Sequence, residues 1–382
     1  MSDSAHRACA FALALAVIAI AGCDGTQTSV APTGPEPATS SQVNQTPEPS
    51  STPEPVRTAW AAGVGAILST TDGVEWTDVT GPEDFPTGVV SGFGAIVFPT
   101  SRDGWAAAQG GCLVSQDCGD SWRLQSFSDS SGAAGLMADG LSFVDEKHGW
   151  AVGSLSQGSF VIATNDGGVR WKAQDPGTGS TQLTDVSFAD RLHGWICGRR
   201  GTILATDDGG VTWRQQAYEK PEGTLETLYW AITCVDAQTA WVVGQDREGA
   251  PLVRTTVDGG TTWKSQDPDV AVPSNETSCA LLGVDFLDAL NGCAVGKLGS
   301  ITVTHDGGQT WQSVGGSIDN GLSGVAYASE AQLWVVGGLG TILGSEDGGE
   351  TWDDQSPEIT MMNGMHLGDL GGIAVPPAAP SN

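Results

Sequence analysis

The chain of 382 residues has little positive charge. It holds 16 Lys+Arg against 45 Asp+Glu, which gives a formal net charge of −29 at pH 7. Proteins that bind nucleic acid neutralise phosphates with basic patches, and a surface this acidic cannot supply such patches broadly. We therefore expect no nucleic-acid partner, and the same acidity argues against tight adhesion of the folded part to anionic lipid.

Signals for catalysis and for metal binding are also missing. The sequence contains no nucleophile elbow, no phosphate loop, no H-E-x-x-H motif and no C-x-x-C pair. His148 and His193 stand in equivalent H-G-W triplets, so we interpret them as turn residues and not as converging ligands. We expect no catalytic residue, no cofactor and no metal site. No stretch has a convincing helical period, which favours an all-β chain.

What the sequence does have is one unit that occurs seven times. The unit is clearest at Thr202 to Trp213, T-I-L-A-T-D-D-G-G-V-T-W, where a short apolar run leads into Asp-Asp-Gly-Gly and a Trp closes the unit. Successive copies lie 41 to 50 residues apart and end at Trp76, Trp122, Trp171, Trp213, Trp263, Trp311 and Trp352. Such a period predicts a repeat architecture.

Six copies keep the order [S/T]-x-D-x-G-x-x-W, and the first copy, around Asp72, is one residue short. An Asp can accept hydrogen bonds from the N–H groups just ahead of it, a Gly can adopt positive φ, and a large indole can cover the turn. The motif resembles the Asp-box, or BNR repeat, of β-propellers. We therefore interpret its aspartates as structural: Asp117, Asp166, Asp208, Asp258, Asp306 and Asp347.

Two further apolar segments precede each unit, so one repeat consists of four strands. In the fourth repeat the predicted strands are Leu183 to Phe188, Gly194 to Gly198, Thr202 to Thr206 and Trp213 to Gln216. Four short antiparallel strands per period predict a seven-bladed β-propeller. The first repeat lacks its opening strand, and Leu370 to Val375 supplies a surplus one. We predict that the two ends complete one blade and close the ring, which removes free sheet edges.

The first residues are predicted to be a targeting segment outside the fold. Arg7 precedes an apolar run that ends in Ile20-Ala21-Gly22-Cys23, which resembles a lipobox and implies lipidation of Cys23. A plain signal peptide cut elsewhere is the alternative. We assign residues 1–22 to the signal, 23–56 to a disordered Ser/Thr/Pro/Glu-rich stalk, 57–377 to the propeller and 378–382 to a tail. We expect a monomer, anchored by lipid in the cell envelope, on its periplasmic or extracellular face.

Six cysteines lie in the predicted propeller, an even number that is compatible with disulfides in an exported protein. Cys112 and Cys118 flank one Asp-box hairpin and form the one pair that we predict as a possible disulfide. Cys234 and Cys293 take positions that Phe, Tyr or Trp fill in other repeats. Burial as free thiols is the alternative for these two.

The scarce basic residues gather in the fourth and fifth repeats. Arg199, Arg200 and Arg214 lie close in sequence to Tyr229 and Trp230, and Trp230 is the only Trp outside the two repeated positions. Aromatic residues beside Arg are typical of protein-binding hot spots. We predict that these five residues lie on one face and bind a partner protein. The alternative is that the arginines are solvated turn residues and that Trp230 is local packing.

A combined pattern, F-x-D-x-x-x-G-W-A-V-G followed by G-x-I-x-x-T-x-D-G-G-x-x-W, is clearest at Phe143 to Trp171 and Phe188 to Trp213. It resembles the photosystem II assembly and stability factor family, the Ycf48-like or Hcf136-like propellers, over nearly all of residues 57 to 377. Members of that family are chaperones that bind a photosystem subunit on the lumenal side of the membrane, through an arginine-rich surface. The resemblance implies a non-catalytic propeller that binds an envelope or membrane protein complex.

Asp-boxes also occur in sialidases and other glycoside hydrolases, so an enzyme or a glycan-binding propeller is the alternative. A sialidase needs three arginines for the substrate carboxylate, a Tyr paired with a Glu, and an Asp acid/base. The chain has only 3 tyrosines, and Tyr327 takes a repeated core position. A two-carboxylate hydrolase stays open, because acidic residues are plentiful and distances across blades cannot be read from a sequence.

Overall fold

The computed structural model describes residues 58–63, 66–80, 95–108, 110–127, 136–154, 158–179, 181–216, 227–270, 276, 278–315, 318–357 and 369–377. The predicted signal, Cys23, the stalk and the tail 378–382 lie outside these residues and stay predictions. All described strands fall between Ala59 and Ala374. Among the described residues, no helix is long and apolar enough to cross a membrane.

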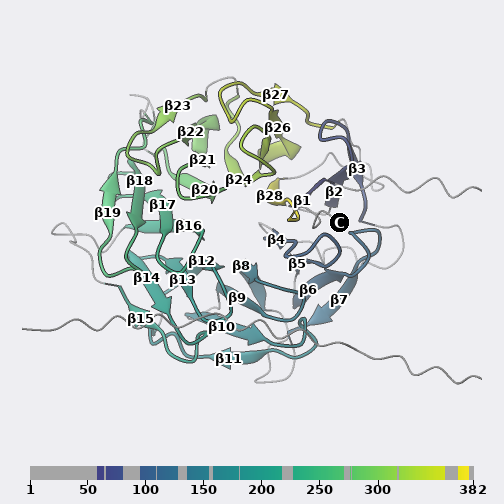
Figure 1. Ribbon diagram of the computed structural model, residues 1–382, viewed down its shortest axis with the longest axis vertical. Helices are drawn as coiled ribbons and strands as arrows, with labels where there is room; N and C mark the ends of the chain where they lie inside the picture. The colour runs from purple at the N-terminus through teal and green to yellow at the C-terminus, as the bar shows by residue number, and fades with distance from the viewer. Residues whose placement is uncertain are drawn as a thin grey trace, which may run out of the picture. The chain divides into compact units, whose positions relative to one another are not determined.

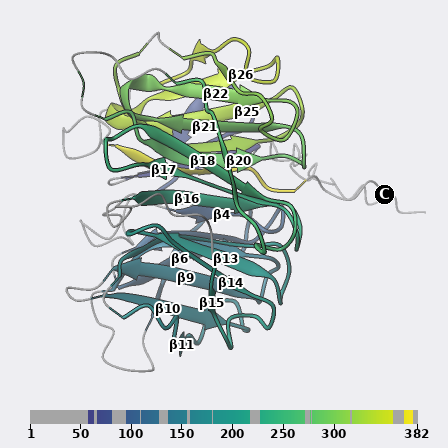
Figure 2. The same ribbon diagram turned by 90° about the vertical axis from the view of Figure 1, so that its left-hand side faces the viewer.

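Seven antiparallel sheets of four strands each are arranged as blades around a central axis (Figure 1). The sheets form because short apolar, β-branched segments alternate with turns rich in Gly and Asp. Figure 2 shows the same blades from the side, as a stack of strands. The predicted all-β, seven-bladed propeller is confirmed, and three strands predicted in the fourth repeat match the observed bounds residue for residue.

Each blade has an innermost strand beside the axis, then a second, a third and an outermost strand. From blade 1 to blade 7 the innermost strands are β28 (Leu370–Ala374), β4 (Ile96–Val97), β8 (Met137–Phe143), β12 (Leu183–Phe188), β16 (Leu228–Cys234), β20 (Leu281–Phe286) and β24 (Leu322–Tyr327). The second strands are β1 (Ala59–Gly63), β5 (Gly104–Ala108), β9 (Gly149–Ser154), β13 (Gly194–Gly198), β17 (Ala240–Gln245), β21 (Gly292–Gly296) and β25 (Leu333–Gly337). The third strands are β2 (Ala66–Thr70), β6 (Gly111–Ser115), β10 (Ser159–Thr164), β14 (Thr202–Thr206), β18 (Pro251–Thr256), β22 (Ile301–Thr304) and β26 (Ile342–Ser345). The outermost strands are β3 (Trp76–Asp78), β7 (Arg123–Ser126), β11 (Lys172–Gln174), β15 (Arg214–Gln215), β19 (Lys264–Gln266), β23 (Gln312–Ser313) and β27 (Asp353–Asp354).

The ring is closed by strands from the two ends of the propeller. β28 pairs antiparallel with β1, with Trp60 opposite Ala374 and Gly63 opposite Leu370. Blade 1 therefore takes its innermost strand from the C-terminal end of the chain and its other three strands from the N-terminal end. The predicted closure is confirmed, and no blade is left with an open seam to its neighbour.

The strand register defines two faces of the ring. In blade 4, Thr206 lies opposite Gly194 at one end of the sheet, and Thr202 lies opposite Gly198 at the other end. The Asp-box turns follow the third strands at the first end, which we call the Asp-box face. The opposite end carries the turns between second and third strands, and we call it the mouth face. Two of these turns, η2 (Lys297–Gly299) and η3 (Gly338–Gly340), are single 3-10 turns.

Each Asp-box turn satisfies its own polar groups, as blade 4 shows. Thr206 Oγ1 donates to Asp208 Oδ1 at 2.8 Å, and Gly210 N donates to Thr206 Oγ1 at 2.9 Å. Thr212 donates its N–H to Asp208 Oδ1 at 2.9 Å and its hydroxyl to Oδ2 at 2.6 Å. The corresponding carboxylates in blades 2, 3, 5, 6 and 7 accept the same backbone bond. Their role in the fold is thus to hold a turn.

Neighbouring blades are joined by tryptophans of the second strands. Trp150 in blade 3 stacks on Phe188 of blade 4, with ring centroids 3.5 Å apart and planes 7° apart. Its indole Nε1 donates to the carbonyl of Gly209, which lies in the Asp-box turn of blade 4, at 3.0 Å. Trp105 and Trp241 make the same stack and the same bond to the next blade. Aromatic contacts between blades are therefore one part of a core that is otherwise largely aliphatic.

All six described cysteines are free thiols. Cys112 is buried in β6, whereas Cys118 is exposed in the Asp-box turn of the same blade, with φ 62°. The possible disulfide between them is not formed, because one sulfur belongs to the core and the other to a turn on the surface. Cys293 is buried in the second strand of blade 6, where most other blades have Trp. Cys234 replaces the Phe on which Trp195 would stack.

Candidate functional site

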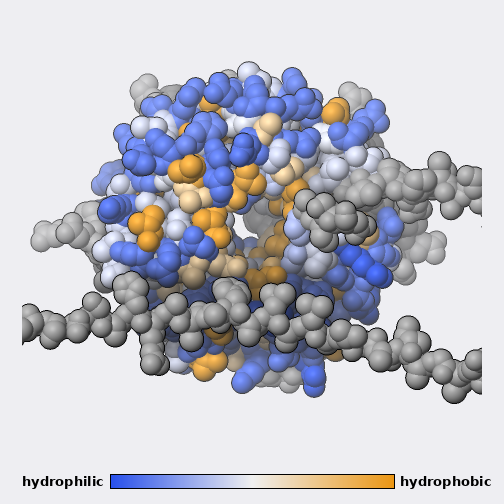
Figure 3. Space-filling model, in the orientation of Figure 1, coloured by the Kyte–Doolittle hydropathy of each residue, from blue (hydrophilic) through white to orange (hydrophobic). Residues whose placement is uncertain are grey.

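The axis of the propeller contains a cavity of about 790 Å³. Figure 3 shows the opening at the centre of the ring, with hydrophobic residues along its walls. A volume in this range is typical of ligand sites, which hold roughly 300–1,000 Å³. The cavity is lined by the innermost strands and by a few residues of the turns on the mouth face. It is the candidate functional site of the molecule.

A β-bulge near the mouth face decides which side chains border the cavity. In β12 the register shifts between Leu183 and Asp185, so Thr184 is the extra residue. The innermost strands of blades 1, 3, 5, 6 and 7 shift at the equivalent place. The six extra residues all line the cavity and differ in chemistry: Gly371, Asp139, Thr184, Trp230, Leu282 and Ser323. A bulge re-aims the side chain that it inserts. These six positions therefore determine the charge and polarity of the cavity near the mouth face.

The next position along each innermost strand is small in every blade except one. Blade 4 has Asp185 there, and the other blades have Ala95, Gly140, Ala231, Gly283, Gly324 and Gly372. A Cβ added to Gly140 would lie 2.7 Å from Asp185 Oδ1. The neighbouring blade therefore needs a glycine to make room for this carboxylate.

Asp185 joins blades 4 and 5. Its Oδ2 accepts the N–H of Ile232 in β16 at 2.9 Å, and its Oδ1 accepts the N–H of Val186 at 2.8 Å. Burial raises the pKa of this carboxyl to about 7, although both N–H groups act to lower it, and the nearby charge of Asp139 raises it further. Charged Asp185 is thus held by backbone bonds inside a wall that disfavours charge.

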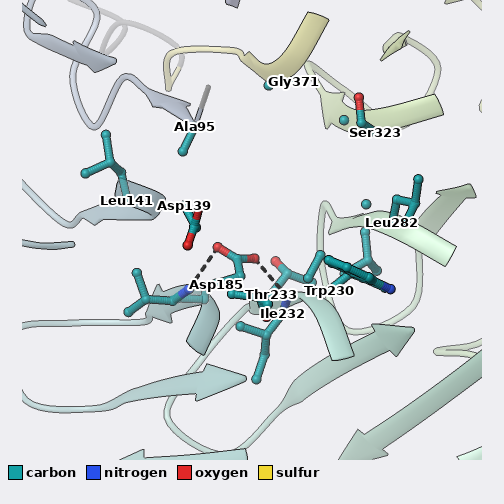
Figure 4. A pocket seen from close by; sticks show the side chains of 18 of the residues that line it. Ala95, Asp139, Leu141, Asp185, Trp230, Ile232, Thr233, Leu282, Ser323 and Gly371 are labelled. Carbon is teal, nitrogen blue, oxygen red and sulfur yellow. Dashed lines mark hydrogen bonds between the residues drawn. The ribbon is translucent and has the colours of Figure 1, made fainter. Parts of the chain in front are cut away.

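Asp139 lies on the adjacent blade, and Figure 4 shows its carboxylate facing that of Asp185. Ser154 Oγ, from the end of β9, donates to Asp139 Oδ2 at 2.9 Å. The Asp139 side chain is open to the cavity, yet enclosure by the walls raises its pKa, while Ser154 and the charge of Arg199 act to lower it. Two carboxylates therefore meet in one part of the cavity.

Arg199 and Trp230 lie together at the mouth. The guanidinium carbon of Arg199 is 5.7 Å from the centroid of the Trp230 ring, which is a cation–π distance. Arg199 follows β13 and forms a bridge with Leu228, so the turn that carries it lies against the start of β16. Lys297 takes the equivalent turn position in blade 6, and all three side chains border the cavity. Lys297 Nζ donates to Ser278 Oγ at 3.2 Å.

The five residues predicted as a partner-binding face do not form one surface. Arg200 is exposed at the tip of the turn beside Arg199, with φ 57°. Arg214 lies opposite Ala205 at the Asp-box end of blade 4 and pairs with Asp207 at 2.9 Å. Tyr229 is 0% exposed and packs in the core between blades 4 and 5. The structure thus brings Arg199, Arg200 and Trp230 to the mouth face, and separates Arg214 and Tyr229 from them.

Asp139 and Asp185 were not among the residues that the sequence pointed to, although a signal for them exists. Once the innermost strands are aligned at their Phe or Tyr, Asp185 interrupts a column of Gly and Ala. Below these residues the cavity wall is aliphatic in all seven blades, with Ile96, Leu141, Val186, Ile232, Val284, Val325 and Ile373. The site therefore offers carboxylates, a cation–π pair and an apolar wall. In the part of the chain that the structure describes, no cluster of His, Cys, Asp and Glu fits a metal ion.

Comparison with known families matches residues 177–278 to the model described as photosynthesis system II assembly factor YCF48. These residues include Asp185, Arg199 and Trp230. A curated relative, "Photosystem II assembly lipoprotein Ycf48" from Synechococcus sp. (strain CC9902), is 28% identical over 143 residues. The match covers 37% of this chain, and the chain spans only 39% of the length of that relative.

Solved structures of similar fold include a protein described as "YCF48 bound to D1 peptide". It is 21% identical, with a TM-score of 0.51, over 68% of this chain and 80% of that one. A glycoside hydrolase, the GH74 enzyme of Niastella koreensis, is 12% identical, with a TM-score of 0.50, over 83% of this chain and 66% of that one. At these identities both likenesses show the fold alone.

Proposed function

We propose that this protein, whose propeller is similar to those of the Ycf48 family, is a non-catalytic assembly factor whose mouth face binds a segment of a membrane protein complex. One observation carries the proposal: exposed Arg199 and half-buried Trp230 form a cation–π pair at the rim of the cavity. Rigid aromatic and Arg side chains beside a pocket are the usual anchors of a protein interface. The matched family and the relative that binds a D1 peptide support the choice of partner class.

The proposal includes the place of the protein in the cell. Lipidation of Cys23 would anchor it in the cell envelope as a lipoprotein, on the periplasmic or extracellular face and as a monomer. Support comes from the sequence Ile20-Ala21-Gly22-Cys23 and from the name of the Synechococcus relative, which is a lipoprotein. Mass spectrometry of the membrane-bound protein tests this part, because a diacylglycerol on Cys23 is expected and an unmodified N-terminus contradicts it.

The binding proposal is tested by capture of the tagged full-length protein from detergent-solubilised membranes of its host. We expect one multi-subunit membrane complex with the wild type and its loss with Arg199→Glu or Trp230→Ala. Arg214→Glu is the matched control, since Arg214 is also exposed but lies at the Asp-box end and pairs with Asp207. Equal recovery of the same proteins by all four forms would contradict a partner at the mouth.

A second candidate function is hydrolysis of a glycan, because two carboxylates face each other in the cavity. Glycoside hydrolases use such pairs, one protonated and one charged. Against this function, both oxygens of Asp185 already accept backbone N–H groups, so the carboxyl serves to link two blades. Release of reducing ends from a panel of polysaccharides by the wild type, and its loss with Asp139→Asn, would favour the hydrolase over the assembly factor.

A further inference from the structure

The two carboxylates in the cavity lack a matched cation. The positive charge of Arg199 acts on Asp139, but its guanidinium lies over the ring of Trp230. Lys297, in blade 6, donates to Ser278. None of the described ion pairs includes Asp139 or Asp185. Among the described contacts, two backbone N–H groups and the Ser154 hydroxyl compensate the charge of this carboxylate pair directly, and Arg199 acts on Asp139 without forming an ion pair with it.

This arrangement costs the folded protein free energy. Enclosure disfavours the charged form of both carboxyls, and the charge of Asp139 also disfavours ionisation of Asp185. A cation placed between the two would relieve this cost, because an opposite charge within a few ångströms favours ionised carboxylates. The room for such a cation exists, since both aspartates line a cavity of about 790 Å³.

The aliphatic wall beside the carboxylates indicates which class of cation fits the cavity. Aliphatic side chains from all seven innermost strands line the cavity next to the carboxylates, and Leu141 and Ile232 flank Asp185 in Figure 4. A bare metal ion gains nothing from such a wall and prefers six or more oxygen ligands. An alkyl chain that ends in an ammonium group gains from both parts, because its stem is apolar and its head is a compact charge with three donors.

We propose that Asp139 and Asp185 bind the ammonium group of a lysine side chain that the partner segment inserts through the mouth, with its stem along the aliphatic wall. This inference rests on the proposed function, which supplies the partner segment. It names what that segment must present: a lysine at the point that enters the cavity. Arg199 and Trp230 then contact the segment at the rim.

A model compound tests the site without the partner. The full-length protein labelled with ¹⁵N is titrated with hexylammonium chloride and, separately, with the neutral analogue hexanol at pH 7.5. The indole N–H signal of Trp230 reports on the mouth, and its absence in Trp230→Phe identifies it among the 14 tryptophans. We expect a saturable shift with hexylammonium and a much smaller one with hexanol. Equal shifts with the two compounds would mean that the cavity binds alkyl chains without recognising the ammonium group, and would overturn the proposal.

Two variants separate a binding role from a structural one. Asp185→Asn should weaken hexylammonium binding on the order of tenfold, the equivalent of about one pKa unit. Asp285→Asn is the matched control, because Asp285 is also an enclosed carboxyl of an innermost strand and accepts the N–H of Tyr327 of the next blade, but does not line the cavity. Equal loss in both variants would overturn the site.

Asp139→Asn keeps the test open if Asp185→Asn fails to fold. Asp139 accepts a bond from Ser154 alone among the described contacts and joins no two blades, so its replacement should leave the ring intact. We expect a loss similar to that of Asp185→Asn. Unchanged binding by a folded Asp139→Asn would contradict the paired site. Competition by CaCl₂ at millimolar concentration would also contradict it, because it would mark an inorganic cation site.

The pH dependence is a further readout. The titratable groups that line the cavity with Asp185 are Asp139, Arg199 and Lys297, and Cys197 lies opposite Asp185 in the strand pair. A bound ammonium should displace the proton of Asp185, so hexylammonium affinity should rise between pH 6 and pH 8. Affinity that does not change with pH would count against Asp185 as a ligand.

Failure of this inference can be told from failure of the proposed function. If hexylammonium does not bind but Arg199→Glu still loses a membrane complex, the lysine site is wrong and the assembly role stands. If hexylammonium binds as expected and no complex is recovered, the ammonium site stands and the partner is wrong.

Discussion

The aspartates of the Asp-box turns and those of the cavity are the same side chain in opposite environments. Hydrogen bonds from the hydroxyl and the N–H of Thr212 lower the pKa of Asp208 to about 2, whereas burial raises that of Asp185 to about 7. The first position is repeated in every blade, and the second occurs once. Repeated positions hold the ring together and lower its free energy, and positions that differ between blades carry the specific chemistry of this protein.

The largest test of this comparison uses two tryptophans. Trp150→Ala removes a stack on Phe188 and a bond to Gly209 that recur between blades, and should lower the free energy of unfolding by about 3–5 kcal/mol. Trp230→Ala removes a partly exposed residue of a bulge and should cost roughly 1 kcal/mol or less. Denaturant unfolding of the two variants measures the difference. Similar losses would mean that Trp230 is a core residue and not part of a site.

A smaller effect is expected within an Asp-box. Asp208→Ala leaves the N–H of Thr212 and the hydroxyl of Thr206 without their acceptor and should destabilise by about 1–3 kcal/mol. Its neighbour Asp207 is the control, because it pairs with Arg214 at the exposed surface, and Asp207→Ala should lower stability much less than Asp208→Ala. Thermal unfolding of both variants checks this prediction. Equal shifts in Tm would contradict a stabilising role of the Asp208 carboxylate in the turn.

The Asp-box turn of blade 2 has Cys118 where other blades have Gly, so a substitution there should increase stability. Cys118 adopts φ 62°, where the equivalent Gly167 and Gly209 have φ 74°. A left-handed conformation costs a residue with a Cβ roughly 1 kcal/mol relative to Gly. Cys118→Gly should therefore raise stability by about 0.5–1 kcal/mol, measured by denaturant unfolding. Gly209→Ala, the reverse change in blade 4, should lower it, and a gain there would contradict this reading.

The smallest effect is on the pH dependence of stability. The folded pKa of Asp208 is lowered from 3.8, so its contribution is present above about pH 4 and is lost as the pH falls towards 2. The folded pKa of Asp185 is raised from 3.8, so the folded protein binds more protons between pH 4 and 7 and loses stability as the pH rises through that window. Asp185→Asn should flatten this second slope, as urea unfolding at pH 4.5 and 7.5 would show. An unchanged slope would contradict the raised pKa.

Sequence reasoning recovered the fold because the repeat makes each strand visible seven times. The strands Leu183 to Phe188 and Thr202 to Thr206 follow from turn residues on either side, and Leu370 to Val375 is recognisable because it matches the opening of other repeats. The site is harder to predict, since its residues occur in single blades and do not recur with the repeat. Tyr229 was taken for a surface residue, although it aligns with Leu183 and Leu281, which are buried. The pairing of Asp139 with Asp185 depends on the packing of adjacent blades, which the sequence does not state.

The closure of the ring by β28 also determines how the propeller responds to mechanical load. Chain entering at Thr58 continues directly into β1, which is held on one side by β2 and on the other by β28. Ladder bonds run perpendicular to the strands, so a pull along β1 strains both ladders in shear and at the same time. A tether attached upstream of Ala59 would therefore transmit force to the best-secured strand of blade 1, and not to an edge that could peel away one bond after another.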